Sequence, residues 1–143
     1  MNTKKKAELL EKVDLFSDMK ERSLSAIAQR LIEREYQTGD RIIEQGSQGF
    51  GLFIIASGKA DVKFEAEDGS TSVVNTIGGG EFFGEMALLD DGPRSASVYA
   101  VEDTVCLILS RIDFVAVMLK DAEMGVMIAT ELAKRLRRSL ESK

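Results

Sequence analysis

Closely spaced glycines divide the middle of this chain into short segments, and this spacing constrains the fold more than any other feature. Between residues 34 and 110, the runs between glycines are rich in β-branched and aromatic residues, which favour strands. In one run, Ala60, Val62 and Phe64 alternate with charged residues, as expected of a strand with one solvated face. Residues 67–70, with the sequence EDGS, predict a hairpin turn. Many short strands with close turns predict a β sandwich or barrel. The glycines stand at positions 39, 46, 49, 51, 58, 69 and 78–80.

Helical periodicity precedes this β-rich region. Residues 4–31 carry apolar side chains at intervals that place them on shared helical faces. Asp14 or Ser17, and Ser23, are the expected N-caps between short helices, because their side-chain oxygens can accept from free backbone N–H groups. The shared faces are formed by Leu9, Leu10 and Val13, and then by Leu24, Ile27, Ala28 and Leu31.

A second helical region follows the β-rich one, over residues 111–140. It is expected to contain one short helix and a longer one capped by Asp121. The sequence therefore predicts an α+β fold in a single domain of residues 1–143, with a β roll over residues 33–110 between two sets of helices. The helical positions are Ile112, Val115 and Leu119, and then Ile128, Leu132, Leu136 and Leu140 with Ala129 and Ala133 beside them.

Composition excludes several classes of site. The chain has 143 residues, no histidine and one cysteine, so it lacks the residues for His-based nucleophile triads, the usual zinc sites and His-ligated haem. Cys106, in the apolar run TVCLILS, is expected to be a buried core thiol. The net charge of −5 does not indicate nucleic-acid binding over the whole surface. Because the N-terminus lacks the apolar core of a secretory signal and the apolar runs are too short to cross a bilayer, we expect a cytoplasmic protein with no transmembrane segment.

The stretch FGEMALLDDGPRSASV, residues 83–98, carries the functional signal. Gly84 opens a short helix, whose first backbone N–H groups favour a phosphate. In an extended strand, Arg94 shares its inward face with Ala96 and Val98, and a buried guanidinium needs an anion. That anion is either a ligand phosphate, which arginine holds with two parallel hydrogen bonds, or a carboxylate of the chain. The carboxylates near in sequence are Glu85, Asp90 and Asp91.

Glu85 suggests what else such a ligand would contain. A carboxylate repels a phosphate, but it accepts readily from a sugar hydroxyl. A site with Arg94 and Glu85 therefore suits a phosphate and a ribose together, which indicates a nucleotide.

These residues resemble the cyclic-nucleotide-binding domain family, which includes the catabolite activator protein, protein kinase regulatory subunits and cyclic-nucleotide-gated channels. The phosphate-binding cassette of that family runs F-G-E-x-A-L, a short spacer, then R-x-A, and it corresponds here to residues 83–96. The resemblance extends from about Leu15 to Leu136 and implies a jelly roll flanked by helices. The matching residues are Phe83, Gly84, Glu85, Ala87, Leu88, Arg94 and Ala96, with upstream landmarks at Gly39, Asp40, Glu44, Gly46 and Gly58.

The resemblance also implies roles for individual residues. Arg94 would hold the cyclic phosphate, with the backbone N–H groups of Ala87 and Ser95 and the Ser95 hydroxyl. Glu85 and the Gly84 backbone would hold the ribose 2′-hydroxyl. The ligand would be cAMP or cGMP, because a serine after the arginine is compatible with either, and no cofactor or metal is implied. Three further ligand contacts are expected: Val62 at the base, Phe83 in the cassette, and Arg135 at the base from a C-terminal helix that closes as a lid.

The resulting hypothesis is a non-enzymatic cyclic-nucleotide sensor that signals through its C-terminal lid helix. The alternative is a protein–protein interaction module with a vestigial pocket, in which the Ile128–Leu140 stripe binds a second copy or a partner helix rather than its own roll. A metal-dependent enzyme on the same roll is disfavoured because it would need histidine ligands. Because few residues of this sequence follow Leu136, we expect no DNA-binding helix-turn-helix. The basic cluster Lys134, Arg135, Arg137 and Arg138 is interpreted as a solvated helix end.

Overall fold

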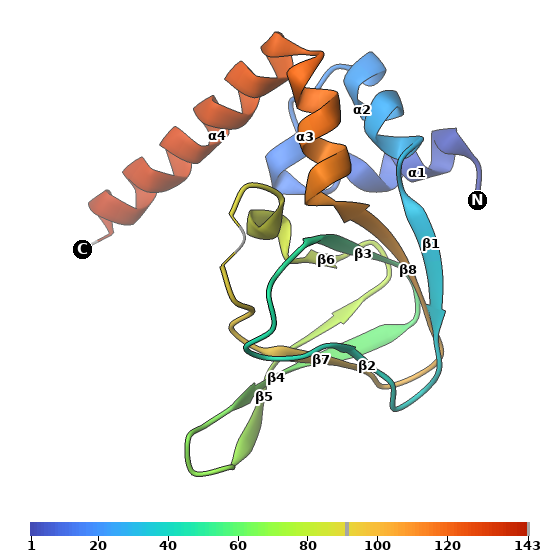
Figure 1. Ribbon diagram of the computed structural model, residues 1–143, viewed down its shortest axis with the longest axis vertical. Coiled ribbons are helices and arrows are strands. Elements are labelled where there is room, and N and C mark those ends of the chain that lie inside the picture. Colours follow the sequence, from blue (N-terminus) through green and yellow to red (C-terminus); the bar gives the residue numbers. More distant parts are fainter. Residues whose placement is uncertain (91, 143) are drawn as a thin grey trace. The chain divides into compact units, whose positions relative to one another are not determined.

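The structure, a computed structural model, describes residues 1–90 and 92–142, which form two compact units (Figure 1). The helical unit comprises residues 1–30 and the chain from Ile112 onward. The roll comprises residues 31–111. That both units act as one domain over residues 1–143 stays a prediction.

The roll consists of two antiparallel four-stranded sheets, in the orders β1-β8-β3-β6 and β2-β7-β4-β5. Its core lies where the inner faces of the sheets meet, and each sheet supplies four buried residues: Phe53, Ile55, Cys106 and Ile108 from the first, and Ile43, Ala60, Ile77 and Val98 from the second. The predicted α+β jelly roll is confirmed. The strands are β1 (Ile32–Tyr36), β2 (Arg41–Ile43), β3 (Gly51–Ser57), β4 (Lys59–Glu65), β5 (Thr71–Gly78), β6 (Phe82–Phe83), β7 (Ser97–Ala100) and β8 (Thr104–Ser110).

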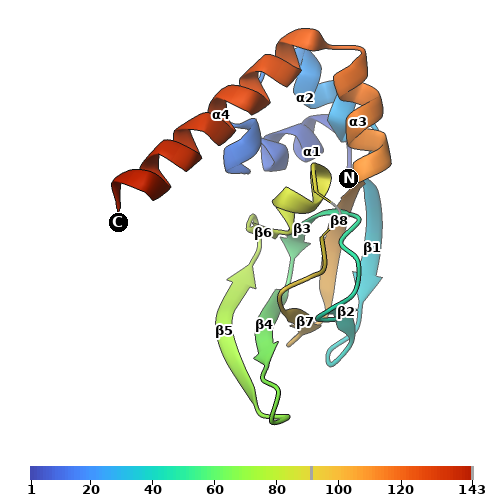
Figure 2. The same cartoon turned by 60° about the vertical axis from the view of Figure 1, so that its left-hand side comes forward.

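The β4–β5 hairpin follows the predicted turn but not the whole predicted alternation. Gly69 in its turn has a positive φ of 86°, as the Asp-Gly pair predicts. Ala60 is buried, whereas Phe64 is exposed and that part of the prediction is wrong. The register of β4 on β5 shifts between Val62 and Lys63, and a bulge of this kind redirects the side chains that follow it. Figures 1 and 2 both show the hairpin extending beyond the other strands of the roll.

The helical unit packs its apolar faces on one another, and the rings of Phe16 and Phe114 meet with their centroids 5.7 Å apart. The predicted faces of the first helices are confirmed at Leu9 and Leu10, and then at Leu24, Ile27 and Ala28, which are buried. Val13 and Leu31 are also buried but lie beyond the ends of these helices. The elements are α1 (Thr3–Leu10), the 3₁₀ turn η1 (Asp14–Phe16), α2 (Glu21–Ala28), α3 (Arg111–Leu119) and α4 (Ala122–Glu141).

Two details of the helical prediction are wrong. Asp14, Ser17 and Ser23 are not helix N-caps: Asn2 caps α1, Val13 precedes η1, and α2 begins after Lys20 without a side-chain cap. In α3, Ile112 and Leu119 are exposed, and the buried side chains are Phe114 and Val117. The helix buries the face with Phe114 because Phe114 offers more apolar area to bury than Ile112 does.

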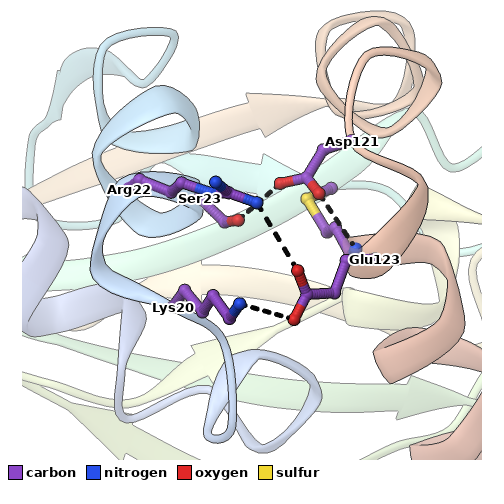
Figure 3. Close-up of polar contacts among 6 residues, drawn as sticks. Lys20, Arg22, Ser23, Asp121 and Glu123 are labelled. Atoms are coloured by element: carbon purple, nitrogen blue, oxygen red, sulfur yellow. Dashed lines mark hydrogen bonds and ion pairs between the residues drawn. The ribbon is translucent and has the colours of Figure 1, made fainter.

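Polar side chains join the start of α2 to the start of α4 (Figure 3). The Ser23 hydroxyl donates to the Asp121 carboxylate over 2.6 Å, and Asp121 accepts from the Met124 backbone N–H as the N-cap of α4. The cap predicted at Asp121 is confirmed. Glu123 forms ion pairs with Lys20 at 2.7 Å and Arg22 at 3.5 Å. We call Lys20, Arg22, Ser23, Asp121 and Glu123 the α2–α4 latch.

Two further sequence features can be placed. Cys106 is buried in β8, as predicted, and burial raises the pKa of its thiol to about 12. It therefore stays protonated near neutral pH and packs as an apolar group. In the part of the chain that the structure describes, none of the helices has the length and apolar character needed to cross a membrane.

Candidate nucleotide-binding site

The second residue of the cassette is a glycine in the left-handed conformation. Gly84 has a φ of 82° and precedes the 3₁₀ turn η2 (Glu85–Leu88), in agreement with the predicted short helix. Ala87 and Leu88 are buried, which anchors the turn to the roll. The Ala87 backbone N–H donates to the Gly84 carbonyl over 3.0 Å, so the turn itself already uses one of the two N–H groups expected to face a phosphate.

Arg94 lies between the cassette turn and β7, where its backbone is held by a loop. Its N–H donates to the Ser47 carbonyl over 2.7 Å, and its carbonyl accepts from the Gly46 N–H over 2.8 Å. The predicted strand alternation is wrong here, because β7 begins only at Ser97. Ser97, expected to face outward, is buried, and its hydroxyl accepts from the Gln45 N–H over 2.8 Å. Loop hydrogen bonds, and not strand pleating, therefore orient Arg94.

The Arg94 side chain nevertheless points into the roll, as predicted. Its Nη2 donates to the Gly51 carbonyl over 2.7 Å, and its Cζ lies over the Phe53 ring, 5.8 Å from the centroid. The side chain is half-buried, and this burial lowers the pKa of the guanidinium, because loss of water disfavours the charged form. The guanidinium remains charged at neutral pH, since arginine has a very high starting pKa.

No carboxylate within residues 1–90 and 92–142 forms an ion pair with Arg94. Burial accounts for the pKa shift of Arg94, with no contribution from an acidic neighbour among the described residues. The internal partners Glu85 and Asp90 are thereby excluded in this structure, and Asp91 lies outside the described residues. A half-buried guanidinium without a carboxylate partner is suited to bind an anion from outside.

Two glycines make room for the guanidinium. A Cβ on Gly84 would overlap Nη1 of Arg94, and a Cβ on Gly49 would lie 3.2 Å from its Nε. Gly84 is therefore required twice, by its positive φ and by the close approach of Arg94. From the sequence, Gly49 and Gly51 were interpreted only as breaks between strands. Their role at the site, and that of Phe53, follows from the folding of β3 against the cassette.

The cleft at Arg94 has a volume of about 210 Å³. It contains four of the predicted ligand-binding residues, and among them Ser95 is exposed. Its volume is below the roughly 300–1,000 Å³ of pockets that enclose a whole drug-sized ligand, so it suits the phosphate end of a nucleotide. The cleft is lined by Gly84, Met86, Ala87, Asp90, Gly92, Pro93, Arg94 and Ser95.

The remaining predicted site residues lie outside that lining. Glu85 is the half-buried first residue of η2. Phe83, in β6, stacks on Phe53 with the ring centroids 5.1 Å apart, and Val62, in β4, packs against the core of the roll. Arg135 is on α4 in the helical unit, where its Nε lies 3.5 Å from Glu131.

Two larger clefts are less suited to an anion. The first, of about 640 Å³ in the roll, is lined by the carboxylates of Glu35, Asp40 and Asp103, and its described lining contains no lysine or arginine. The second, of about 710 Å³ in the helical unit, contains Arg22, Arg30 and Lys120. Both guanidinium groups already pair with carboxylates, Lys120 is exposed, and the Asp121 carboxylate also lines this cleft. The small cleft at Arg94 is therefore the better phosphate site.

Known proteins resemble this chain over most of its length. The family model "Cyclic nucleotide-binding domain" matches residues 33–121. Cyclic AMP receptor protein of Thermus thermophilus is 42% identical over 104 residues, which cover 73% of this chain and 48% of that protein. cGMP-dependent protein kinase 2 of Homo sapiens is 37% identical over 107 residues, which cover 73% of this chain and 14% of the kinase.

A solved structure shows the same fold. The N-terminal domain of a transcriptional regulator from Streptomyces coelicolor matches with a TM-score of 0.86 at 24% identity, covering 92% of this chain and 94% of that one. The chain spans about half the length of the Thermus receptor protein and a small part of the human kinase. With the cassette sequence, the jelly roll and the family match in agreement, the chain belongs to the cyclic nucleotide-binding domain family.

Proposed function

We propose that this chain is a regulatory module that binds a cyclic nucleotide, with Arg94 as the clamp for the cyclic phosphate. The observation that carries the proposal is Arg94 itself, a half-buried residue that lines a cleft and forms no ion pair with any described carboxylate. A cyclic phosphate would supply the missing negative charge through charge-assisted hydrogen bonds.

Neighbouring groups complete the proposed site. Ser95 offers its backbone N–H and its hydroxyl at the cleft. The Ala87 N–H contributes as a shared donor, because it also binds the Gly84 carbonyl. Glu85, with the Gly84 backbone, accepts from the ribose 2′-hydroxyl. Val62 contacts the base.

The signalling part of the proposal concerns α4. A sensor works only if the ligand binds one of two states more tightly. We place the closing movement in α4, with Arg135 reaching the base when the nucleotide is bound. The module acts without catalysing a reaction, and its proposed location is the cytoplasm.

A titration tests the proposal. Nucleotide-free protein is titrated by calorimetry with cAMP and with cGMP, and with 5′-AMP as the non-cyclic control. Micromolar or tighter binding of at least one cyclic nucleotide is expected, and the ratio of the two affinities identifies the ligand. If neither binds, the proposed function is wrong.

The ribose assignment has its own test. Glu85→Ala is expected to weaken binding of the preferred nucleotide and to change little the binding of its 2′-deoxy analogue, which lacks the hydroxyl. Strong discrimination against the 2′-deoxy analogue by the variant would show that another group holds the ribose.

A second candidate function rests on the end of α4. Leu136 and Leu140, on the predicted stripe, are 62% and 60% exposed, whereas Ile128 is buried. An exposed apolar stripe favours a helix–helix contact with a second copy or with a partner. Sedimentation with and without cyclic nucleotide tests this. A change in mass on adding the nucleotide would show that nucleotide binding and self-association are coupled. A monomer under both conditions would exclude self-association through this stripe.

A further inference from the structure

The guanidinium of Arg94 is oriented by a backbone carbonyl and an aromatic ring. The Gly51 carbonyl accepts from Nη2 over 2.7 Å, and the Cζ atom lies over the face of Phe53, 5.8 Å from the centroid. A cation within about 6 Å of a ring centroid is attracted by the negative face of the ring. One hydrogen bond leaves the guanidinium free to rotate about it, and the ring removes that freedom.

Phe53 is itself held in a fixed position. It is 2% exposed in β3, where it pairs with Ile108 of β8 and with Phe83 of β6. The Phe83 ring stacks on it at 5.1 Å with an interplanar angle of 15°, and the Phe50 ring meets it edge-on at 5.7 Å. A ring packed in this way can serve as a rigid platform.

An aromatic platform differs from a carboxylate in its effect on charge. A carboxylate would orient the guanidinium, but it would also cancel part of the positive charge that a ligand phosphate needs. A ring orients the guanidinium and leaves its net charge intact. The site therefore gains a positioned cation while keeping its attraction for an anion.

We propose that Phe53 is a positioning residue, which holds the Arg94 guanidinium so that its unused N–H groups face the phosphate of the ligand. Phe53 acts through Arg94 and does not itself touch the nucleotide. Phe83 was expected from the sequence to contact the ligand. In this proposal it acts indirectly, because its ring supports Phe53. The inference rests on the proposed function, because it assigns the phosphate to Arg94.

The binding test compares substitutions of two buried residues in the same strand. Phe53→Leu removes the ring, Phe53→Tyr keeps it, and Ile55→Val perturbs the same core two residues away without touching Arg94. Phe53→Leu is expected to weaken cyclic-nucleotide binding about 5- to 30-fold. Phe53→Tyr and Ile55→Val are expected to keep the wild-type affinity within about 3-fold. Wild-type affinity in Phe53→Leu would overturn the inference.

A signal from Arg94 itself tests the inference without ligand. Protein labelled with ¹⁵N-arginine is expected to show the Arg94 Hε resonance shifted upfield by the ring current of Phe53. Phe53→Leu is expected to return it to the ordinary arginine range, and Ile55→Val is expected to leave it shifted. If Phe53→Leu does not fold, the wild-type resonance decides, because an ordinary shift there contradicts the contact.

These two readouts separate the inference from the proposed function. If the wild-type protein binds neither cAMP nor cGMP, the proposed function fails and, with it, the role assigned to Phe53, even where an upfield Hε confirms the contact. If the nucleotide binds and Phe53→Leu changes neither affinity nor the Hε resonance, the inference alone fails.

Discussion

The α2–α4 latch and the Arg94 cleft differ in whether their positively charged side chains pair with carboxylates. In the latch, Lys20 and Arg22 are largely exposed and both pair with the carboxylate of Glu123. In the cleft, Arg94 is half-buried and pairs with no carboxylate among the described residues. Paired, solvated charges contribute little beyond local structure. An unpaired and partly buried charge costs folding free energy, which an incoming anion can recover.

The largest expected effect is on ligand binding at Arg94. Arg94→Ala should weaken cyclic-nucleotide binding by about 2–5 kcal/mol, because it leaves the phosphate in the cleft without its counter-charge. The matched control is Arg41→Ala, since Arg41 is also in the roll but is exposed and pairs with Glu44 at 3.6 Å. Calorimetry should find wild-type affinity in the control. An equal loss of nucleotide affinity in both variants would contradict the distinction between the half-buried Arg94 and the exposed, paired Arg41.

The next effect concerns the space that Arg94 occupies. Gly84→Ala and Gly69→Ala both place a side chain at a positive φ, but only the Cβ at position 84 would meet Arg94, and position 69 is open. Each should lose about 1–2 kcal/mol of folding free energy from the left-handed conformation. Gly84→Ala should in addition weaken nucleotide binding, which Gly69→Ala should not. Denaturant unfolding and calorimetry measure the two effects, and unchanged binding in Gly84→Ala would show that the close approach is unimportant.

A smaller effect is expected in the latch. Ser23 is 5% exposed, and its hydroxyl donates to Asp121, so Ser23→Ala should lower the free energy of unfolding by about 1–2 kcal/mol. Arg22→Ala should change it by less than about 0.5 kcal/mol, because Arg22 is 70% exposed. Urea denaturation compares the two. A larger loss of unfolding free energy in Arg22→Ala than in Ser23→Ala would mean that the Arg22–Glu123 ion pair stabilises the fold more than the Ser23–Asp121 hydrogen bond does.

The smallest effect is a dependence of stability on acid pH. The hydrogen bond from Ser23, followed by that from the Met124 N–H, lowers the pKa of Asp121. A carboxyl group with a lowered pKa in the folded state stabilises the fold above its unfolded pKa of about 3.9 and loses that contribution as the pH falls through the folded pKa. Ser23→Ala should therefore flatten the fall in thermal stability below about pH 4. An unchanged acid profile would mean that Asp121 does not contribute to it.

The sequence predicts those features of the molecule that depend on local chemistry. The Asp-Gly turn and the cap at Asp121 follow from short stretches of sequence, and the structure contains both. The inward direction of Arg94 was also predicted, but from a strand alternation that is wrong, because loop hydrogen bonds hold its backbone. The cassette motif identified the family because its residues lie close together in the chain. Local patterns also gave the apolar faces of α1 and α2.

The errors arose where distant segments decide the outcome. Ser97 was expected to face outward, but the Gln45 N–H, 52 residues away, draws its hydroxyl into the roll. Ser23 was expected to cap a helix, but its hydroxyl meets Asp121 across the helical unit. Phe53 lies in a strand that reaches Arg94 only through folding. No local pattern carries such contacts, because they depend on which strands and helices become neighbours.

The central claim is that Arg94 contacts the phosphate of a cyclic nucleotide, and side-chain NMR of ¹⁵N-arginine protein tests it most directly. On saturation with the nucleotide that binds in calorimetry, the Arg94 Nη and Hε resonances should shift and exchange more slowly with water, whereas those of Arg41 should not change. Saturated binding with unchanged Arg94 resonances would contradict the claim and place the phosphate elsewhere.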